Sequence, residues 1–149
     1  MAIGRLDEDS EGLLLLTTDG QMSELVRSKK VEKEYFAQVD GLISCEAIEK
    51  LKNGVEIGFD GKKYITRKCN AKAIEEPAFA PRTQKIRDER HGPTSWVSIT
   101  LTEGKFRQVR KMTAAVGFPT LRLVRVRIGE MHLGNLKSGE VVELKKIEI

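Results

Sequence analysis

A tight polar turn near the start of the chain carries the first side chain that could do chemistry. Within the stretch from Gly4 to Gly20, Asp7 follows one apolar segment, and a second apolar run, Leu13 to Leu16, comes after the turn. A turn anchored on both sides can hold a carboxylate rigidly, as a nucleophile or general base requires. Asp9 is the rival candidate, and a turn-forming role is the alternative for either aspartate. We favour Asp7 because it directly follows the strand, and we expect Asp9 to structure the turn.

A cationic helix is the second candidate, predicted from Phe106 to Val116. With Val109 set at 0°, Met112 and Val116 fall within about 60° of it and form a buried stripe. The opposite side carries Arg107, Arg110 and Lys111. Cations near a helix N-terminus suit phosphate and lower the pKa of a nearby carboxyl group. The alternative is an ordinary amphipathic surface helix.

Tyr35 is the third candidate. The segment from Lys33 to Val39 alternates as a strand and places Lys33, Tyr35 and Ala37 on one face. A tyrosine on a half-buried strand usually fills the core, and its functional alternative is a ring that stacks on a nucleic-acid base.

The charge of the chain is unevenly distributed. Its 149 residues carry a formal net charge of +4, yet residues 82–127 hold 11 Lys and Arg side chains against three acidic ones. Charge concentrated in this way is typical of a protein that binds a polyanion. A solvated basic face is the alternative.

Several classes of protein are excluded by composition. The two cysteines, Cys45 and Cys69, form no CxxC pair, which excludes a disulfide framework and a cysteine zinc site. Two histidines are too few for a histidine-rich metal site, so we expect no metal. The longest aliphatic run has four residues, far short of a transmembrane helix. Without a signal peptide, a cytoplasmic location is expected.

The pattern of apolar positions predicts a mixed α+β fold. Strands are predicted at 3–6, 13–17, 33–39, 96–102, 121–128 and 141–144, with further short strands between 55 and 74. Helices are predicted at 19–27, 44–53 and 106–116, and a long loop at 75–93. Because the helices and strands do not alternate regularly, we expect a largely antiparallel sheet with flanking helices.

Three segments together resemble the motifs of an enzyme family. They are Gly4–Gly20, with Asp7 at the position of an invariant aspartate, Lys33-Glu34-Tyr35, and Glu103–Met112 continued by Ala114–Gly117. In this order and spacing the chain resembles, over nearly its whole length, the pseudouridine synthases of the RsuA/RluB/RluE/RluF family. The segments 93–96 and 117–123 resemble most the RluE-type branch, whose members modify a uridine in large-subunit (23S) ribosomal RNA.

The resemblance implies the catalytic fold of that family and a reaction without a cofactor, in which uridine becomes its C-glycoside isomer pseudouridine. Asp7 is then the nucleophile and attacks either C6 of the uracil or C1′ of the ribose. The glycosidic bond breaks, the base rotates, and C5 joins C1′. By motif position, Arg110 keeps Asp7 ionised, and Tyr35 stacks on the extruded uracil.

Other basic residues are the expected RNA contacts, because phosphate contacts offset the cost of removing the uridine from its stack. These are Arg5, Lys33, Arg107, Lys111, Arg122, Arg125, Arg127, Arg82, Lys85, Arg87 and Arg90. The alternative leaves the strand arginines paired with acidic residues and the loop disordered until RNA binds. Ribosomal RNA is the one expected partner, without a membrane or an obligate protein partner.

Residues 1–149 are expected to form one pseudouridine synthase catalytic domain. Relatives carry a Lys-Pro strand upstream of the Gly-Arg-Leu-Asp motif, and many carry an S4 RNA-binding domain. Both are expected to be absent here, since Met1 lies three residues before Gly4. A missing strand would expose a sheet edge.

Two other functions compete with the enzyme. One is a non-catalytic or truncated relative that binds ribosomal RNA, and the other is a generic basic ribosome-associated protein. Both predict salt-dependent RNA affinity without a product.

Overall fold

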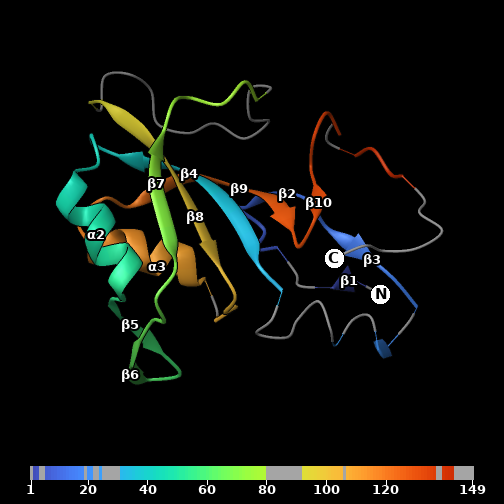
Figure 1. Cartoon of the computed structure of the whole chain (residues 1–149), viewed down its shortest axis with the longest axis horizontal. Helices are drawn as coiled ribbons and strands as arrows, with labels where there is room; N and C mark the ends of the chain where they lie inside the picture. The colour runs from blue at the N-terminus through green and yellow to red at the C-terminus, as the bar shows by residue number, and fades with distance from the viewer. Residues whose placement is uncertain are drawn as a thin grey trace.

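The structure is a computed structural model, shown in Figure 1. It describes residues 2–3, 6–18, 20–21, 24, 31–79, 92–105, 107–136 and 139–142. Within this part of the chain, no helix is long and apolar enough to cross a membrane.

One sheet organises the chain. Its strand order is β10 (Met131–His132), β9 (Thr120–Ile128), β4 (Lys33–Asp40), β8 (Thr94–Leu101) and β7 (Asn70–Ile74). Each neighbouring pair in that order is antiparallel. β2 (Glu11–Gly12) pairs with β9 in parallel, so the sheet is mixed. The predicted α+β class with a largely antiparallel sheet is therefore confirmed.

Two helices, α2 (Cys45–Asn53) and α3 (Gln108–Ala115), pack against the sheet through one core cluster. Strand alternation directs Ala37 and Val39 of β4 into this core, where they meet Leu51 of α2 and Met112 of α3. All four side chains are fully buried. The buried stripe predicted for the third helix is confirmed at Val109 and Met112.

Two small sheets complete the described fold. β5 (Glu56–Phe59) and β6 (Lys62–Ile65) form a hairpin, and β1 (Ala2–Ile3) pairs with β3 (Leu15–Leu16). In Figure 1 the hairpin extends below α2 and α3. Its two-residue turn, Asp60-Gly61, has positive φ at both positions, the geometry that matches the twist of paired strands.

Local sequence signals account for the boundaries of α2. The Ser44 hydroxyl accepts a hydrogen bond from the Ala47 amide at 3.1 Å, as an N-cap residue does. Gly54 ends the helix with a φ of 106°, a conformation that disfavours other residues. The helix predicted at 44–53 therefore ends where expected and begins one residue later than predicted.

Other boundaries differ from the prediction. The third helix begins at Gln108, because Arg107 takes the left-handed conformation, with φ 52° and ψ 33°. The strand predicted at 13–17 is limited to Leu15–Leu16, and β10 was not predicted. Of the strand predicted at 3–6, Ile3 lies in β1, Leu6 is not in a strand, and residues 4 and 5 lie outside the described part. Val141 and Val142 are not in a strand, and residues 143–149 lie outside the described part. Residues 80–91 and most of the helix predicted at 19–27 also lie outside the described part.

Candidate active site

The aspartate turn is anchored to β9 by main-chain contacts. The Ser10 amide donates to the Asp7 carbonyl at 2.9 Å, which closes the turn, and the Leu13 amide donates to the Arg125 carbonyl at 2.8 Å. Between them, Gly12 has a φ of 116° and lies so close to β9 that a Cβ would stand 2.2 Å from the Arg125 carbonyl oxygen. Only glycine permits this approach.

Side chains of β9 reinforce the same anchor. Arg122 forms a two-pronged ion pair with Glu11, at 2.8 and 2.9 Å. The buried Arg125 side chain donates from Nε to the Leu13 carbonyl at 2.9 Å. The turn is thus held at both ends of β2, which is the rigid placement that a reacting carboxylate needs.

Asp7 lies beside Arg107 at an open hollow. The closest approach is 3.5 Å, from Arg107 Nη1 to Asp7 Oδ2, and the Asp7 side chain is 27% exposed. The hollow has a volume of about 370 Å³ and is lined by Asp7, Glu8, Asp9 and Arg107. Asp7 therefore combines a neighbouring positive charge with access from solvent, as a carboxylate nucleophile requires.

Asp9 organises the arginines of this site. Arg107 grips its carboxylate with two hydrogen bonds, of 2.9 and 2.8 Å, the strong bidentate geometry. The hydrogen bond from Arg107 lowers the pKa of Asp9 to about 2 against the opposing effect of burial, and the charges of Arg110 and Arg107 add to this effect. Reciprocally, the hydrogen bond to Asp9 raises the pKa of Arg107.

Arg110 and Arg107 hold different positions from those expected by motif. Arg110 Nη2 donates to the Asp9 carbonyl at 2.8 Å and to the Ser10 hydroxyl at 3.3 Å. Among the described residues, the arginine that forms an ion pair with Asp7 is instead Arg107. The reason is local, since the left-handed backbone of Arg107 places it before the first turn of α3 rather than on the helix face.

A buried carboxylate positions the start of α3. Glu103 is 5% exposed, and it accepts hydrogen bonds from the Arg67 amide at 2.9 Å and from the Gln108 side chain at 2.8 Å. The Tyr64 hydroxyl is a third donor. Burial acts to raise the pKa of Glu103, but these hydrogen bonds outweigh it, and the pKa lies below its ordinary value.

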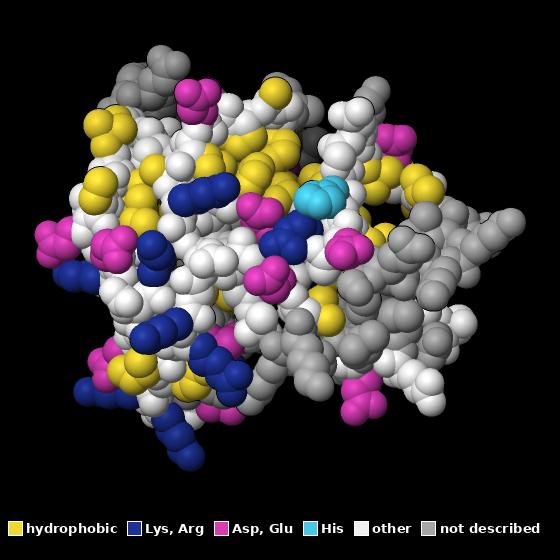
Figure 2. Space-filling view, in the orientation of Figure 1, with side chains coloured by type: hydrophobic (Ala, Val, Ile, Leu, Met, Phe, Trp, Pro, Cys, Tyr) yellow, Lys and Arg dark blue, Asp and Glu magenta, His cyan; other side chains and the backbone are white. Residues whose placement is uncertain are grey.

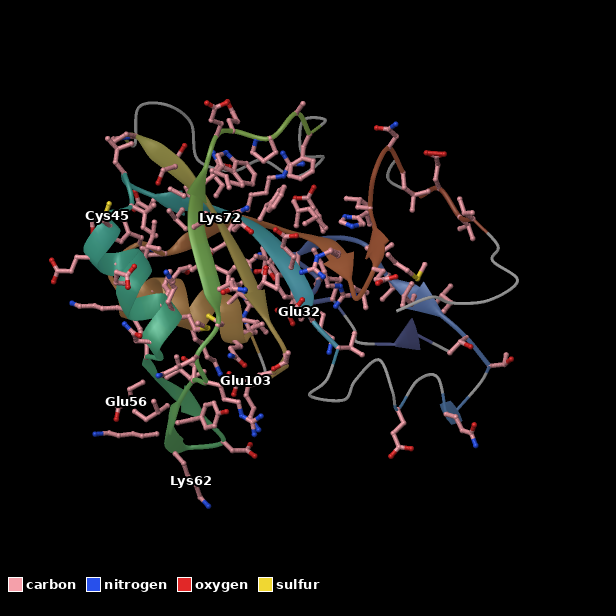
Figure 3. All side chains as sticks on the ribbon, viewed as in Figure 1. Glu32, Cys45, Glu56, Lys62, Lys72 and Glu103 are labelled. Atoms are coloured by element: carbon pink, nitrogen blue, oxygen red, sulfur yellow. The ribbon has the colours of Figure 1, made fainter. Side chains whose placement is uncertain are left out.

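The network continues into the helix turn. The side-chain oxygen of Gln108 accepts a hydrogen bond from the Lys105 main-chain amide at 3.1 Å. The oxygen and the nitrogen of the Gln108 side chain are therefore both hydrogen-bonded. Glu103 and Gln108 thereby fix the segment in which Arg107 lies. Figure 3 shows Glu103 between the β5–β6 hairpin and the end of β8.

Tyr35 and Lys33 project from the same face of β4. Tyr35 is half-buried and packs against the main core cluster, opposite Arg125 of β9 in the strand register. Lys33 is 8% exposed, and burial, followed by the charge of Arg125, lowers its pKa. Catalysis by Tyr35 stays a prediction. RNA contact by Lys33 and Arg125 also stays a prediction, and the burial of these two side chains does not favour it.

The remaining basic residues are engaged in different ways. Arg127 contacts Glu34 at 3.3 Å and Glu32 at 3.5 Å, and Lys111 donates to the Gly58 carbonyl at 2.8 Å. With the Arg122–Glu11 pair, these contacts show that Arg122, Arg127 and Lys111 each have a partner within the protein. RNA contact by these three residues stays a prediction. Five other candidates, Arg5, Arg82, Lys85, Arg87 and Arg90, lie outside the described residues.

Four features of the site could not be predicted from local sequence patterns. Tyr64 alternates like any strand residue, and no local signal indicates that the Gln108 side chain is buried. Glu103 was visible only as a motif letter. The proximity of Arg107 to Asp7 depends on one left-handed residue, which no periodicity reports.

The arrangement can perform covalent catalysis by a carboxylate. The Asp7 carboxylate, which lies beside Arg107 and is partly exposed to solvent, can attack an electrophilic carbon of a bound molecule. Within the described residues, no group of three or more His, Cys, Asp or Glu side chains is arranged to hold a metal.

A family model and individual relatives both match this chain. A family model described as RNA pseudouridylate synthase matches residues 1–115. The chain is 44% identical over 146 residues to ribosomal large subunit pseudouridine synthase E of Vibrio parahaemolyticus, covering 97% of this chain and 60% of that protein. It is also 44% identical over 142 residues to the protein of that name from Xanthomonas campestris, covering 93% of this chain and 74% of that protein.

A solved structure agrees. A crystal structure of a pseudouridylate synthase superposes with a TM-score of 0.67 at 30% identity, covering 89% of this chain and 50% of the other. The chain spans about 60% of the length of the Vibrio relative. Because the family model covers residues 1–115 and the relatives match over almost the whole chain, this protein belongs to the RNA pseudouridylate synthase family.

Proposed function

We propose that this chain carries the catalytic centre for converting a uridine of large-subunit ribosomal RNA into pseudouridine. The observation that carries the proposal is the anchored Asp7, 3.5 Å from Arg107 at an open hollow. The printed names of the relatives, large-subunit pseudouridine synthases, support the choice of substrate. A cytoplasmic location goes with that substrate.

Asp7 acts as the nucleophile in this proposal. It adds either to C6 of the uracil or to C1′ of the ribose, and the bond between N1 and C1′ breaks. The base rotates, C5 bonds to C1′, and the bond between Asp7 and the substrate breaks. C5 loses its proton and N1 gains one, which restores the uracil ring. Atoms balance without a cofactor, because substrate and product are isomers.

The arginines supply the electrostatics of the proposal. Arg107 places a positive charge 3.5 Å from the Asp7 carboxylate, beside a polyanionic substrate. Arg110 holds the turn that carries Asp7 through the Asp9 carbonyl. Tyr35 stacks on the extruded uracil, and phosphate contacts offset an extrusion cost of a few kcal/mol.

Release of tritium from C5 of uridine tests the proposal. The substrate is 23S ribosomal RNA, labelled at uridine C5 and taken from cells that lack the cognate modification. We expect the chain to release tritium and the Asp7→Asn variant to release none while still binding RNA. Glu76→Gln, the same change of charge at an exposed carboxylate away from the turn, is the matched control.

The outcomes separate the alternatives. Equal release by the chain and by Asp7→Asn would contradict the role of Asp7. RNA binding without release by any variant would identify a binding-only relative.

A further inference from the structure

Two groups of cations among the described residues differ in their partners. The β9 arginines Arg122 and Arg127 are ion-paired with Glu11 and Glu34, and Arg125 is buried. The charges of Arg122 and Arg127 are therefore compensated within the protein, whereas the Arg125 side chain has no acidic partner in the described part of the chain but is shielded from solvent by burial. Compensated charges release few counterions when RNA binds, so they contribute little to RNA affinity.

The second group lies on and just after the β5–β6 hairpin. Its members, which we name the hairpin cations, are Lys62, Lys63, Arg67 and Lys68, and all four are exposed. Among the described residues, the three lysines make no ion pair, although the acids Glu56 and Asp60 share the hairpin. Figure 2 shows Lys and Arg side chains gathered at the lower left, over this hairpin.

The hairpin is tied to the segment that carries the candidate active site. Lys111 of α3 donates to the Gly58 carbonyl at 2.8 Å. At the base of the hairpin, Tyr64 and the Arg67 amide donate to Glu103, and the Lys105 ammonium lies 5.2 Å from the Tyr64 ring centre. The hairpin cations are therefore held in a defined position relative to Arg107 rather than carried on an independent arm.

The shape of the hairpin suits an RNA backbone. The Asp60-Gly61 turn is tight, so the strands need little ordering on binding. In Figure 3 Lys62 projects outward at the far end of the hairpin, away from the core. Lysines act as point charges for phosphate and carry no base readout, so this surface would position RNA rather than read its sequence.

We propose that the hairpin cations form a docking surface for the phosphate backbone of the RNA that flanks the modified uridine. The inference rests on the proposed function for the identity of the partner as RNA. It assigns the main RNA contact of the described chain to the hairpin and not to the β9 arginines.

A pair of matched double variants tests the proposal. Lys62→Gln with Lys63→Gln removes two hairpin cations. Lys50→Gln with Lys52→Gln removes the same charge from α2, where both lysines pair with glutamates of their own helix. Binding of unmodified 23S RNA transcript is measured at several salt concentrations, together with KM and kcat for tritium release.

The hairpin variant is expected to weaken RNA binding and raise KM by about five- to tenfold with kcat little changed. The slope of log affinity against log salt concentration should fall by about 1.5, as loss of two phosphate contacts predicts. The α2 variant should change neither quantity appreciably. Circular dichroism checks that both variants are folded.

Each other outcome overturns the inference. Equal effects of the two double variants would contradict it, and so would absence of RNA binding by the unchanged chain. A binding defect seen on ribosomal particles but not on naked RNA would indicate a protein partner instead. If the unchanged chain binds RNA but releases no tritium, the binding comparison still decides the hairpin, while the proposed function alone fails.

Discussion

Asp9 and Glu103 are two carboxylates that contact the residues at the start of α3, yet their surroundings differ. Asp9 is 44% exposed and is held by the guanidinium groups of Arg107 and Arg110. Glu103 is 5% exposed and is held by neutral donors from Tyr64, Arg67 and Gln108. The charged cluster borders the open hollow, and the neutral cluster lies in the interior.

The two clusters have different effects on the start of α3. The hydrogen bonds to Glu103 fix its position, and the arginines around Asp9 supply its positive charge. Ion pairs at a solvated surface contribute little to stability, but they concentrate positive charge beside Asp7. Hydrogen bonds to a buried carboxylate fix geometry, because any donor left unsatisfied carries a high cost. We therefore expect substitutions at Glu103 to reduce stability first, and substitutions at Arg107 to reduce catalysis first.

Replacement of the buried carboxylate should have the largest effect on stability. Glu103→Ala leaves the Arg67 amide and the Gln108 side chain without their acceptor, so we expect a loss of about 3–4 kcal/mol. Urea unfolding measures the change, with Glu76→Ala as the exposed control. A loss below about 1 kcal/mol would show that the neutral cluster does not hold the fold.

Gly12→Ala should break the anchor of the charged cluster. A Cβ 2.2 Å from the Arg125 carbonyl oxygen forces β2 away from β9, and the φ of 116° is unfavourable for alanine. We expect about 2–3 kcal/mol of destabilisation and a fall in turnover. Gly134→Ala is the control, because it also has positive φ but has open space around it. If both variants lose the same free energy of unfolding, the positive φ and not the close approach to β9 would be the cause.

Arg107→Gln should separate catalysis from stability. It removes the ion pair to Asp7 and two hydrogen bonds to Asp9, and we expect kcat to fall about 10- to 100-fold. Arg107→Lys should recover only part of the loss, since lysine lacks the planar fork. Arg127→Gln is the comparison, because Arg127 pairs with two glutamates that lie outside the Asp7 turn, and it should retain more of kcat at saturating RNA. If Arg127→Gln loses as much, proximity to Asp7 is not what matters.

The smallest expected effect is the pH dependence of Asp9. Its pKa is lowered from 3.8 to about 2 in the folded protein, so its stabilising contribution is complete above pH 4 and is lost as the pH falls toward 2. Solvent screening limits the contribution to at most about 1 kcal/mol. The Asp9→Asn variant should show a shallower loss of stability between pH 4 and pH 2 than the unchanged chain. Parallel curves would exclude an electrostatic contribution from Asp9.

Much of the sheet could be predicted from the sequence. β4, β8 and β9 alternate clearly because one face of each meets the helices, and α2 has both capping signals. β10 escaped prediction because two residues are too few to show a period.

The candidate site was only partly predictable. The turn around Asp7 and the cations of the third helix were visible in the sequence, and Asp9 was expected to structure the turn. The positions of Arg107 and Arg110 relative to Asp7 were not, because a helical wheel assumes helical backbone and Arg107 has φ 52°. The ion pairs of the β9 arginines depend on strand register, which local patterns do not report.

The division between the two carboxylate clusters is tested most directly by single-turnover release of tritium from uridine C5, measured with protein in excess over 23S RNA. Asp7→Asn and Glu103→Gln are compared, each alongside its urea unfolding midpoint. We predict that Asp7→Asn keeps the midpoint and loses release, whereas Glu103→Gln lowers the midpoint and keeps measurable release. Release retained by Asp7→Asn, or abolished by Glu103→Gln at an unchanged midpoint, would contradict this account.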